Sequence, residues 1–141
     1  MLKILIVDPN DPFRRSLKKV LVNRFPLVDV QEAADGNEGW QLVEAFHPGL
    51  IFLEMHLPAE TGLELASRIK ADYPEIIIVI LTSYDLPEYK MEVEQLGVEY
   101  MVPKDDWTGE DMMALVQSIL SDLKMDESGY QGQINPHQQT P

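Results

Sequence analysis

The strongest constraint on the fold is a short apolar run that ends in a carboxylate. Residues 50–53 are Leu, Ile, Phe and Leu, Glu54 follows them, and Pro58 and Gly62 then interrupt the pattern. A continuous apolar run of this length is typical of a strand buried on both faces. Open parallel sheets bind their ligands at the carboxyl edge of the strands. Glu54 is therefore a candidate site residue, although a solvated acid that merely ends the strand would give the same pattern.

Four other segments also have the character of strands, and a segment with helical spacing follows each of the five. The predicted strands are residues 2–7, 28–34, 50–54, 76–81 and 98–102. The connections are long enough for parallel strands, and right-handed crossovers place helices on both faces of the sheet. The prediction is an α/β fold, a doubly wound (βα)5 domain with a five-stranded parallel sheet.

Composition limits the chain to one domain with a tail. The length of 141 residues gives room for one sizeable core, which we place in residues 1–124. Residues 125–141 are polar and lack periodicity, so we expect a flexible tail. The absence of cysteine excludes disulfides and cysteine-ligated metal sites. Neither a signal peptide nor a membrane span is recognisable, so a cytoplasmic protein without a membrane contact is expected.

The charge is strongly negative. With 11 Lys and Arg against 24 Asp and Glu, the formal net charge is −13, which repels phosphate backbones and counts against nucleic-acid binding. Several basic residues gather in the first predicted helix and could dock an acidic partner, although a solvated helix face is the simpler interpretation. These residues are Arg14, Arg15, Lys18, Lys19 and Arg24.

Four polar residues stand at the ends of predicted strands. Asp8, Glu54, Thr82 and Lys104 follow the first, third, fourth and fifth strands. Parallel strands bring these ends to one edge of the sheet, so two carboxylates, a hydroxyl and an ammonium converge there. Each residue alone has a simpler explanation, since Asp8 could cap the next helix and Lys104 could only neutralise Glu54. Together, the four favour a functional site.

With these residues the chain resembles a response-regulator receiver domain over residues 1–124. The resemblance implies a flavodoxin-like fold and no enzyme activity of its own. It also implies that a histidine kinase or a small phosphodonor transfers a phosphoryl group, with Mg²⁺, to an Asp at the end of the third strand. The segments that carry it are Ile4-Leu5-Ile6-Val7-Asp8 with Phe13-Arg14, Leu53-Glu54-Met55-His56-Leu57-Pro58 with Gly62-Leu63-Glu64, Leu81-Thr82-Ser83, and Gly97 with Lys104.

The resemblance assigns roles to the residues at the strand ends. Asp8, the side chain of Glu54 and the backbone carbonyl of His56 would surround Mg²⁺, and Thr82 and Lys104 would bind the phosphoryl oxygens. No cofactor is certain, because this set is short of one carboxylate and at most weak Mg²⁺ binding is expected.

Three departures from the family pattern bear on function. Glu54 takes the position of the acceptor Asp, and its extra methylene misplaces the carboxylate for in-line attack. Pro9 replaces the second acid after the first strand and cannot ligate a cation through its side chain. Met101 takes the position of the switching aromatic, and the adjacent Tyr100 would point to the other side of the strand.

The expected function is that of an atypical receiver, a protein-interaction module that signals without being phosphorylated. An ion pair between Glu54 and Lys104 would permanently replace the contact between phosphoryl group and lysine. The alternative is a phosphorelay receiver that still accepts a phosphoryl group, on Glu54 or on Asp8, from a histidine kinase with Mg²⁺. A flavin-binding enzyme shares the architecture, but the acidic, proline-rich loop after the first strand disfavours it.

The partners expected from the resemblance are a histidine kinase, another receiver or an output protein, and a homodimer is also allowed. The family's output face is the fourth helix, the fifth strand and the fifth helix. Methionine-rich surface suits partner binding, although core packing is the simpler explanation of each of these residues. The residues in question are Tyr89, Met91, Met101, Trp107, Met112 and Met113.

Overall fold

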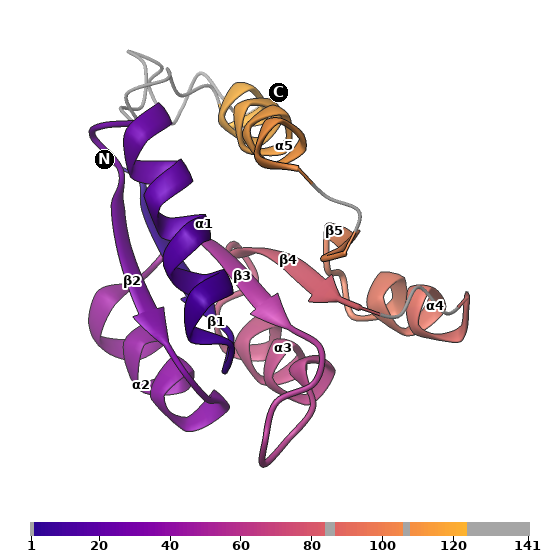
Figure 1. Ribbon diagram of the computed structural model, residues 1–141. Coiled ribbons are helices and arrows are strands. Elements are labelled where there is room, and N and C mark those ends of the chain that lie inside the picture. The colour runs from indigo at the N-terminus through magenta and orange to yellow at the C-terminus, as the bar shows by residue number, and fades with distance from the viewer. Residues whose placement is uncertain (1, 84–86, 106–107, 124–141) are drawn as a thin grey trace, which may run out of the picture.

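The computed structural model describes residues 2–83, 87–105 and 108–123, except the side chains of residues 87–89. Five parallel strands form one sheet in the order β2-β1-β3-β4-β5 (Figure 1). This topology confirms the predicted doubly wound α/β fold. The strands are β1 (Lys3–Val7), β2 (Asp29–Ala33), β3 (Leu50–Glu54), β4 (Ile77–Thr82) and β5 (Tyr100–Pro103).

Helices cover both faces of the sheet, as right-handed crossovers require (Figure 1). Helices α1 and α5 pack on one face, and α2, α3 and α4 pack on the other. The helices are α1 (Asp11–Arg24), α2 (Gly36–Phe46), α3 (Gly62–Asp72), α4 (Pro87–Gln95) and α5 (Gly109–Asp122). The predicted polar tail, residues 125–141, lies outside the described residues.

The central strands divide their side chains between two cores. In β1, Ile4 and Ile6 point toward α1 and α5, whereas Leu5 and Val7 point toward α2 and α3. This alternation is the period-two geometry of a strand, and both sets are buried because helices cover both faces. All five residues of β3 are buried, which explains its continuous apolar run up to Glu54.

Local signals position the ends of the helices. Asn10 is the N-cap of α1 and accepts a hydrogen bond from the Phe13 N–H at 3.0 Å, with Pro12 in the first turn. Asp8 is therefore not the cap of this helix. Gly97 ends α4 with a φ of 78°, a left-handed conformation that favours glycine. The adjacent Val98 N–H donates to the Val93 carbonyl, so β5 starts later than residue 98.

Tyr100 and Met101 lie on opposite faces of β5, as predicted. Tyr100 packs against the core under α1 and α5, and Met101 packs against the core on the other side. Burial, reinforced by the nearby Asp122 and Glu99 carboxylates, raises the pKa of the Tyr100 hydroxyl above its usual value. Across the described residues, no helix is long and apolar enough to cross a lipid bilayer.

Candidate functional site

The carboxyl edge of the sheet brings three of the predicted site residues into direct contact. The Lys104 Nζ lies 2.7 Å from Asp8 Oδ2 and 3.2 Å from Glu54 Oε1. Lys104 therefore bridges the two carboxylates that follow β1 and β3. The bridge is nearly dry, because the side chains of Asp8, Glu54 and Lys104 are 0%, 10% and 10% exposed.

Thr82 lies at the same edge, as the last residue of β4. Its side chain is buried, and its backbone carbonyl accepts a hydrogen bond of 2.9 Å from the Lys104 N–H. This backbone contact fixes the start of the loop after β5 against the end of β4. The structure thus places all four predicted residues at one edge, with Lys104 between the carboxylates.

Both oxygens of the Glu54 carboxylate are engaged. Oε1 accepts from Lys104, and Oε2 accepts a hydrogen bond of 2.7 Å from the backbone N–H of Met55. The side chain therefore folds back onto its own strand end. A buried carboxylate is stable only when it is paired and hydrogen-bonded, and Glu54 meets both conditions within the chain.

Asp8 is held in the same way. Its Oδ1 accepts a hydrogen bond of 2.8 Å from the backbone N–H of Asn10, and its Oδ2 accepts from Lys104. Pro9 lies between Asp8 and Asn10 in the chain and is exposed. It contributes no ligand but allows the loop to turn back on Asp8. Each carboxylate thus has one backbone donor and a share of one ammonium.

The ring of Phe13 covers the Lys104 ammonium. Nζ lies 4.4 Å from the ring centroid, within the range of a cation–π interaction. Phe13 comes from the first turn of α1 and is half-buried. The ammonium is therefore enclosed by two carboxylates and one aromatic face.

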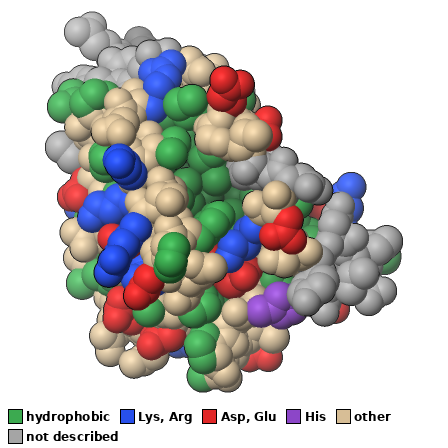
Figure 2. All heavy atoms as spheres, in the orientation of Figure 1, with side chains coloured by type: hydrophobic (Ala, Val, Ile, Leu, Met, Phe, Trp, Pro, Cys, Tyr) green, Lys and Arg blue, Asp and Glu red, His purple; other side chains and the backbone are tan. Residues whose placement is uncertain are grey.

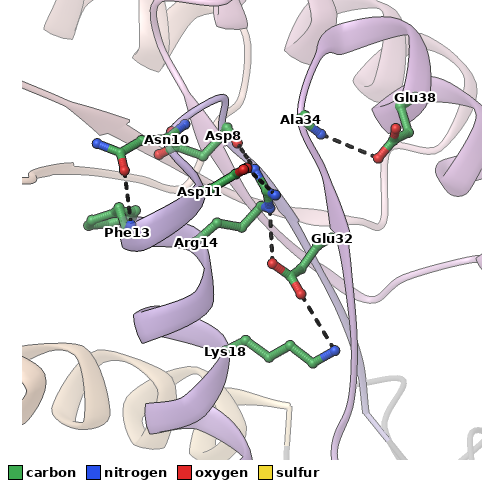
Figure 3. Close-up of polar contacts among 9 residues, drawn as sticks. All are labelled: Asp8, Asn10, Asp11, Phe13, Arg14, Lys18, Glu32, Ala34 and Glu38. Carbon is green, nitrogen blue, oxygen red and sulfur yellow. Dashed lines mark hydrogen bonds and ion pairs between the residues drawn. The ribbon is translucent and has the colours of Figure 1, made fainter.

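Arg14 is a member of this site that sequence reasoning missed (Figure 3). Its Nη1 donates to the Asp8 carbonyl oxygen at 2.6 Å, its Nε donates to Glu32 Oε1 at 2.9 Å, and its Nη2 donates to Asp11. Burial disfavours the charged form, but the hydrogen bonds to Asp11 and Glu32 outweigh this effect and raise the pKa of Arg14. Lys18 adds a longer contact of 3.6 Å to Glu32.

The interpretation of the first basic cluster as a solvated helix face is therefore wrong for Arg14. Arg14 is buried, whereas Arg15 and Lys19 are exposed. The sequence does contain a signal, because Arg14 precedes Leu17 and Leu21 by three and seven positions and so shares their helix face.

The loop between β3 and α3 packs tightly against Glu54. The Gly62 N–H donates to the Met55 carbonyl at 2.7 Å, and His56 pairs with Thr61 in an isolated antiparallel bridge. A Cβ atom at Gly62 would lie 2.3 Å from the Glu54 carbonyl oxygen, far inside van der Waals contact. Only glycine allows this approach, which holds the Met55 backbone where its N–H reaches Glu54.

The described residues do not fit a Mg²⁺ ion. Among them, no group of three or more His, Cys, Asp or Glu side chains could hold a metal. The predicted set had Asp8 and Glu54 as carboxylate ligands, but both are bonded to the Lys104 ammonium, and the position of a further acid is Pro9.

A comparison with known protein families identifies the family of this chain. The family described as the response regulator receiver domain matches residues 4–117. The chain belongs to this family. The predicted receiver is therefore confirmed, in preference to a flavin-binding enzyme, and the chain is a two-component signalling domain.

Two relatives of this chain are named as regulatory proteins. It is 32% identical over 105 residues to the oxygen regulatory protein NreC of Staphylococcus haemolyticus, covering 74% of this chain and 48% of NreC. It is 25% identical over 118 residues to the transcriptional regulatory protein DegU of Brevibacillus brevis, covering 84% of this chain and 48% of DegU. The receiver thus spans about half the length of these two relatives.

Solved structures share the fold. A CheY-like receiver domain protein from Methanospirillum hungatei superposes with a TM-score of 0.79 at 24% identity, covering 86% of this chain and 95% of that one. At this identity the likeness shows the fold alone. Receivers of this family interact with partner proteins such as kinases.

Proposed function

We propose that this receiver is an atypical protein-interaction module of two-component signalling that works without being phosphorylated, and that it is not an enzyme. The observation that carries the proposal is the Lys104 bridge, with Nζ 2.7 Å from Asp8 and 3.2 Å from Glu54. The ammonium that would meet an incoming phosphoryl group is already paired with two buried carboxylates of the chain itself.

The side-chain length and the hydrogen bonds of Glu54 support this proposal. A phosphoacceptor needs an oxygen placed in line with the phosphorus, because phosphoryl transfer depends almost entirely on positioning and electrostatics. Glu54 has one more methylene than Asp, and both of its oxygens accept hydrogen bonds within the chain. Attack by Glu54 would require these two contacts to break in a buried environment.

The ion pair between Glu54 and Lys104 also supports a single, fixed conformation of the domain. A carboxylate carries one negative charge, whereas a phosphoryl group carries about 1.5 to 2 at neutral pH. Glu54 would therefore satisfy Lys104 without reproducing the full charge change that drives a phosphorylation switch. We propose that the signal is carried by which proteins bind the domain and not by a change of its phosphorylation state.

One observation favours the alternative, a phosphorelay receiver that accepts a phosphoryl group with Mg²⁺ on Glu54 or Asp8. Thr82 and Lys104, the residue types that hold phosphoryl oxygens in the family, remain together at the strand ends. Against it stands the absence, among the described residues, of a set of ligands that fits Mg²⁺. The experiment below separates the two functions.

The partners we propose are a histidine kinase, another receiver or an output protein, and the surface is that of α4, β5 and α5. A hollow of about 220 Å³ lies between α4 and β5. Met101 lines this hollow, and Met91 of α4 is 63% exposed, but Met112 belongs to the core and cannot contribute. Tyr89 and Trp107 lie outside the described side chains. We also propose a cytoplasmic location for this domain. Its net charge of −13 supports the proposal that it does not itself bind nucleic acid, because that charge repels phosphate backbones.

The test is the intact mass of the protein after incubation with acetyl phosphate and Mg²⁺. The matched control is the double variant Glu54→Asp, Pro9→Asp, which restores both family carboxylates to the same chain. We expect the control to gain one phosphoryl group and the native protein to gain none. A phosphoryl group on the native protein would overturn the proposal, and mapping the modified residue would then assign it to Glu54 or Asp8.

A further inference from the structure

Lys70 and Glu99 form an ion pair at the edge where the strands begin, opposite the candidate site. The Lys70 Nζ lies 2.8 Å from Glu99 Oε2. Several exposed basic side chains gather over α1 (Figure 2), whereas the Lys70 side chain is only 10% exposed. Lys70 belongs to the last turn of α3, and Glu99 directly precedes β5. The pair therefore joins two elements that are far apart in the chain.

Glu99 supplies a hydrogen-bond acceptor to β4 at a point where β5 has not yet begun. The Ile77 N–H donates to the Gly49 carbonyl on the β3 side, so the next N–H, that of Ile78, points toward β5. The ladder between β4 and β5 starts one residue later, at Val79. The Ile78 N–H donates instead to Glu99 Oε1, at 3.0 Å.

Lys70 does the same for carbonyl groups that lead into β4. Its Nζ donates to the Ile76 carbonyl at 2.6 Å and to the Pro74 carbonyl at 3.3 Å. With Glu99 as the third acceptor, all three N–H donors of the ammonium are used. Ile76 and Ile78 are buried, and a buried backbone group without a partner is costly. The two side chains thus replace backbone partners that β5 does not supply.

The backbone just before β5 is engaged by α4. Gly97 ends this helix with a φ of 78°, and the Val98 N–H donates to the Val93 carbonyl at 3.1 Å. An extension of β5 to residue 98 would break this bond and unwind the end of α4. The Glu99 side chain spans the gap, and so it ties the connection between α4 and β5 to β4.

Glu99 also lines the hollow of the proposed partner surface. The hollow of about 220 Å³ between α4 and β5 is lined by Glu99 together with Val93, Val98 and Met101. One side chain thus contacts both the backbone of β4 and the wall of this hollow. The position of that wall relative to the sheet therefore depends on the pair between Lys70 and Glu99.

We propose that the Lys70–Glu99 pair is a latch that positions the α4–β5 surface. While the latch is closed, α4 and β5 keep one arrangement against β4. Lys70 and Glu99 are positioning residues, since they act through the backbone and need not touch a partner. The inference rests on the proposed function for the role of this surface in partner binding. The latch itself uses neither Glu54 nor a phosphoryl group.

Hydrogen exchange of the full chain, followed by NMR, tests the latch. Glu99→Ala removes the acceptor of the Ile78 N–H, so exchange of this amide should accelerate at least about tenfold more than that of the Phe52 amide in central β3. Lys70→Met breaks the ion pair from the other side and should act in the same direction. Glu99→Gln keeps an oxygen for the Ile78 N–H and should restore most of its protection.

Two exposed residues of the same hollow provide matched controls. Glu94→Ala removes the same charge as Glu99→Ala, and Lys90→Met removes the same charge as Lys70→Met. Neither control touches the hydrogen bonds at the start of β4, so exchange of the Ile78 amide should stay at the native rate. Equal acceleration in the control variants would mean that the change of net charge, and not the latch, governs this amide.

Methionine methyl resonances separate positioning from stabilisation alone. In Glu99→Ala and in Lys70→Met the Met101 methyl resonance should shift, because Met101 lines the hollow. The Met112 resonance, from the core on the other face of the sheet, should stay in place. An ion pair that only stabilises the fold would lower the thermal midpoint and leave the Met101 resonance of the folded protein unchanged.

Either of two results overturns the latch. One is a native Met101 resonance in both latch variants, and the other is an Ile78 amide that accelerates no more than the Phe52 amide. Lys70→Met gives both readings by itself if Glu99→Ala does not fold. Neither reading involves acetyl phosphate, so a native protein that accepts a phosphoryl group would overturn the proposed function and leave the latch standing.

Discussion

Charged side chains at the carboxyl edge of the sheet are held by partners from distant parts of the chain. Lys104 joins Asp8 to Glu54, and Arg14 joins the Asp8 carbonyl to Glu32. Charges that leave water are tolerated when each one is paired, and removing one partner leaves the others uncompensated. The individual residues of this site are therefore structurally interdependent.

The replacement of Arg14 by methionine tests this interdependence. Arg14→Met keeps the length of the side chain but removes the donor to the Asp8 carbonyl and leaves Glu32 only its longer contact of 3.6 Å with Lys18. Breaking a fully buried pair costs about 3–5 kcal/mol, and because Glu32 is partly exposed we expect a loss of about 2–3 kcal/mol in the free energy of unfolding. Urea denaturation, monitored by circular dichroism, measures this loss in the free energy of unfolding.

The matched control for this variant is Arg15→Met. Arg15 is the next residue of α1 but is exposed, so the free energy of unfolding should change by less than about 0.5 kcal/mol. Equal losses in the two variants would show that the Arg14 contacts do not stabilise the fold.

At the scale of elements, the connection from β3 to α3 determines the shape of the site. This connection turns back on the strand through the Gly62–Met55 hydrogen bond of 2.7 Å and the His56–Thr61 bridge. The helix that follows is capped by Thr61, which accepts from the Glu64 N–H at 3.1 Å. The start of α3 is thus fixed against the end of β3, and with it the Met55 N–H that binds Glu54.

Gly62→Ala should disturb this connection. Because the new Cβ would lie 2.3 Å from the Glu54 carbonyl oxygen, the backbone must move. We expect a loss of about 2–3 kcal/mol in the free energy of unfolding, at the upper part of the range for overpacking.

A second glycine at the start of a helix provides the comparison for Gly62. Gly109→Ala adds its Cβ at 3.9 Å from the nearest atom, so stability should stay level or rise by about 0.5 kcal/mol. Chemical denaturation of both variants distinguishes steric conflict from loss of a helix-terminal glycine. If Gly62→Ala were as stable as the native protein, the tight approach of α3 to β3 would not be required.

At the scale of the whole molecule, an α/β sandwich with a small charged edge carries a large excess of acid. The whole chain has 24 Asp and Glu against 11 Lys and Arg, so ion pairs such as those of Arg14 and Lys104 still leave 13 acidic side chains in excess. Self-repulsion of this kind destabilises the compact state and is screened by salt.

The thermal midpoint should therefore rise with ionic strength. Between ~0.01 M and ~0.15 M salt the Debye length falls from ~30 Å to ~8 Å, which screens repulsion across the domain. A gain of ~1 kcal/mol would raise the midpoint of a chain of this size by about 3–5 °C. Calorimetry in NaCl and in KCl measures the shift, which should be equal in the two salts. A falling midpoint would mean that favourable ion pairs dominate over the excess charge.

The sequence by itself determined the order of the elements and the residues at the strand ends. Buried parallel strands produce continuous apolar runs, and helices on both faces produce the intervening amphipathic spacing, so both patterns can be read locally. The same local patterns predicted that Asp8, Glu54, Thr82 and Lys104 share one edge, because strands of a parallel sheet end on the same side.

Only the tertiary structure decided how these residues are paired. The sequence predicted a contact between Lys104 and Glu54, but the shorter distance from Lys104 is to Asp8, and Arg14 joins the site from a helix interpreted as solvated. The hollow between α1 and α5, lined by Val20, Thr108 and Gly109, likewise depends on how two helices that are far apart in the chain pack together. Local periodicity specifies which face of an element is buried, whereas the distances between charges depend on how the elements are packed.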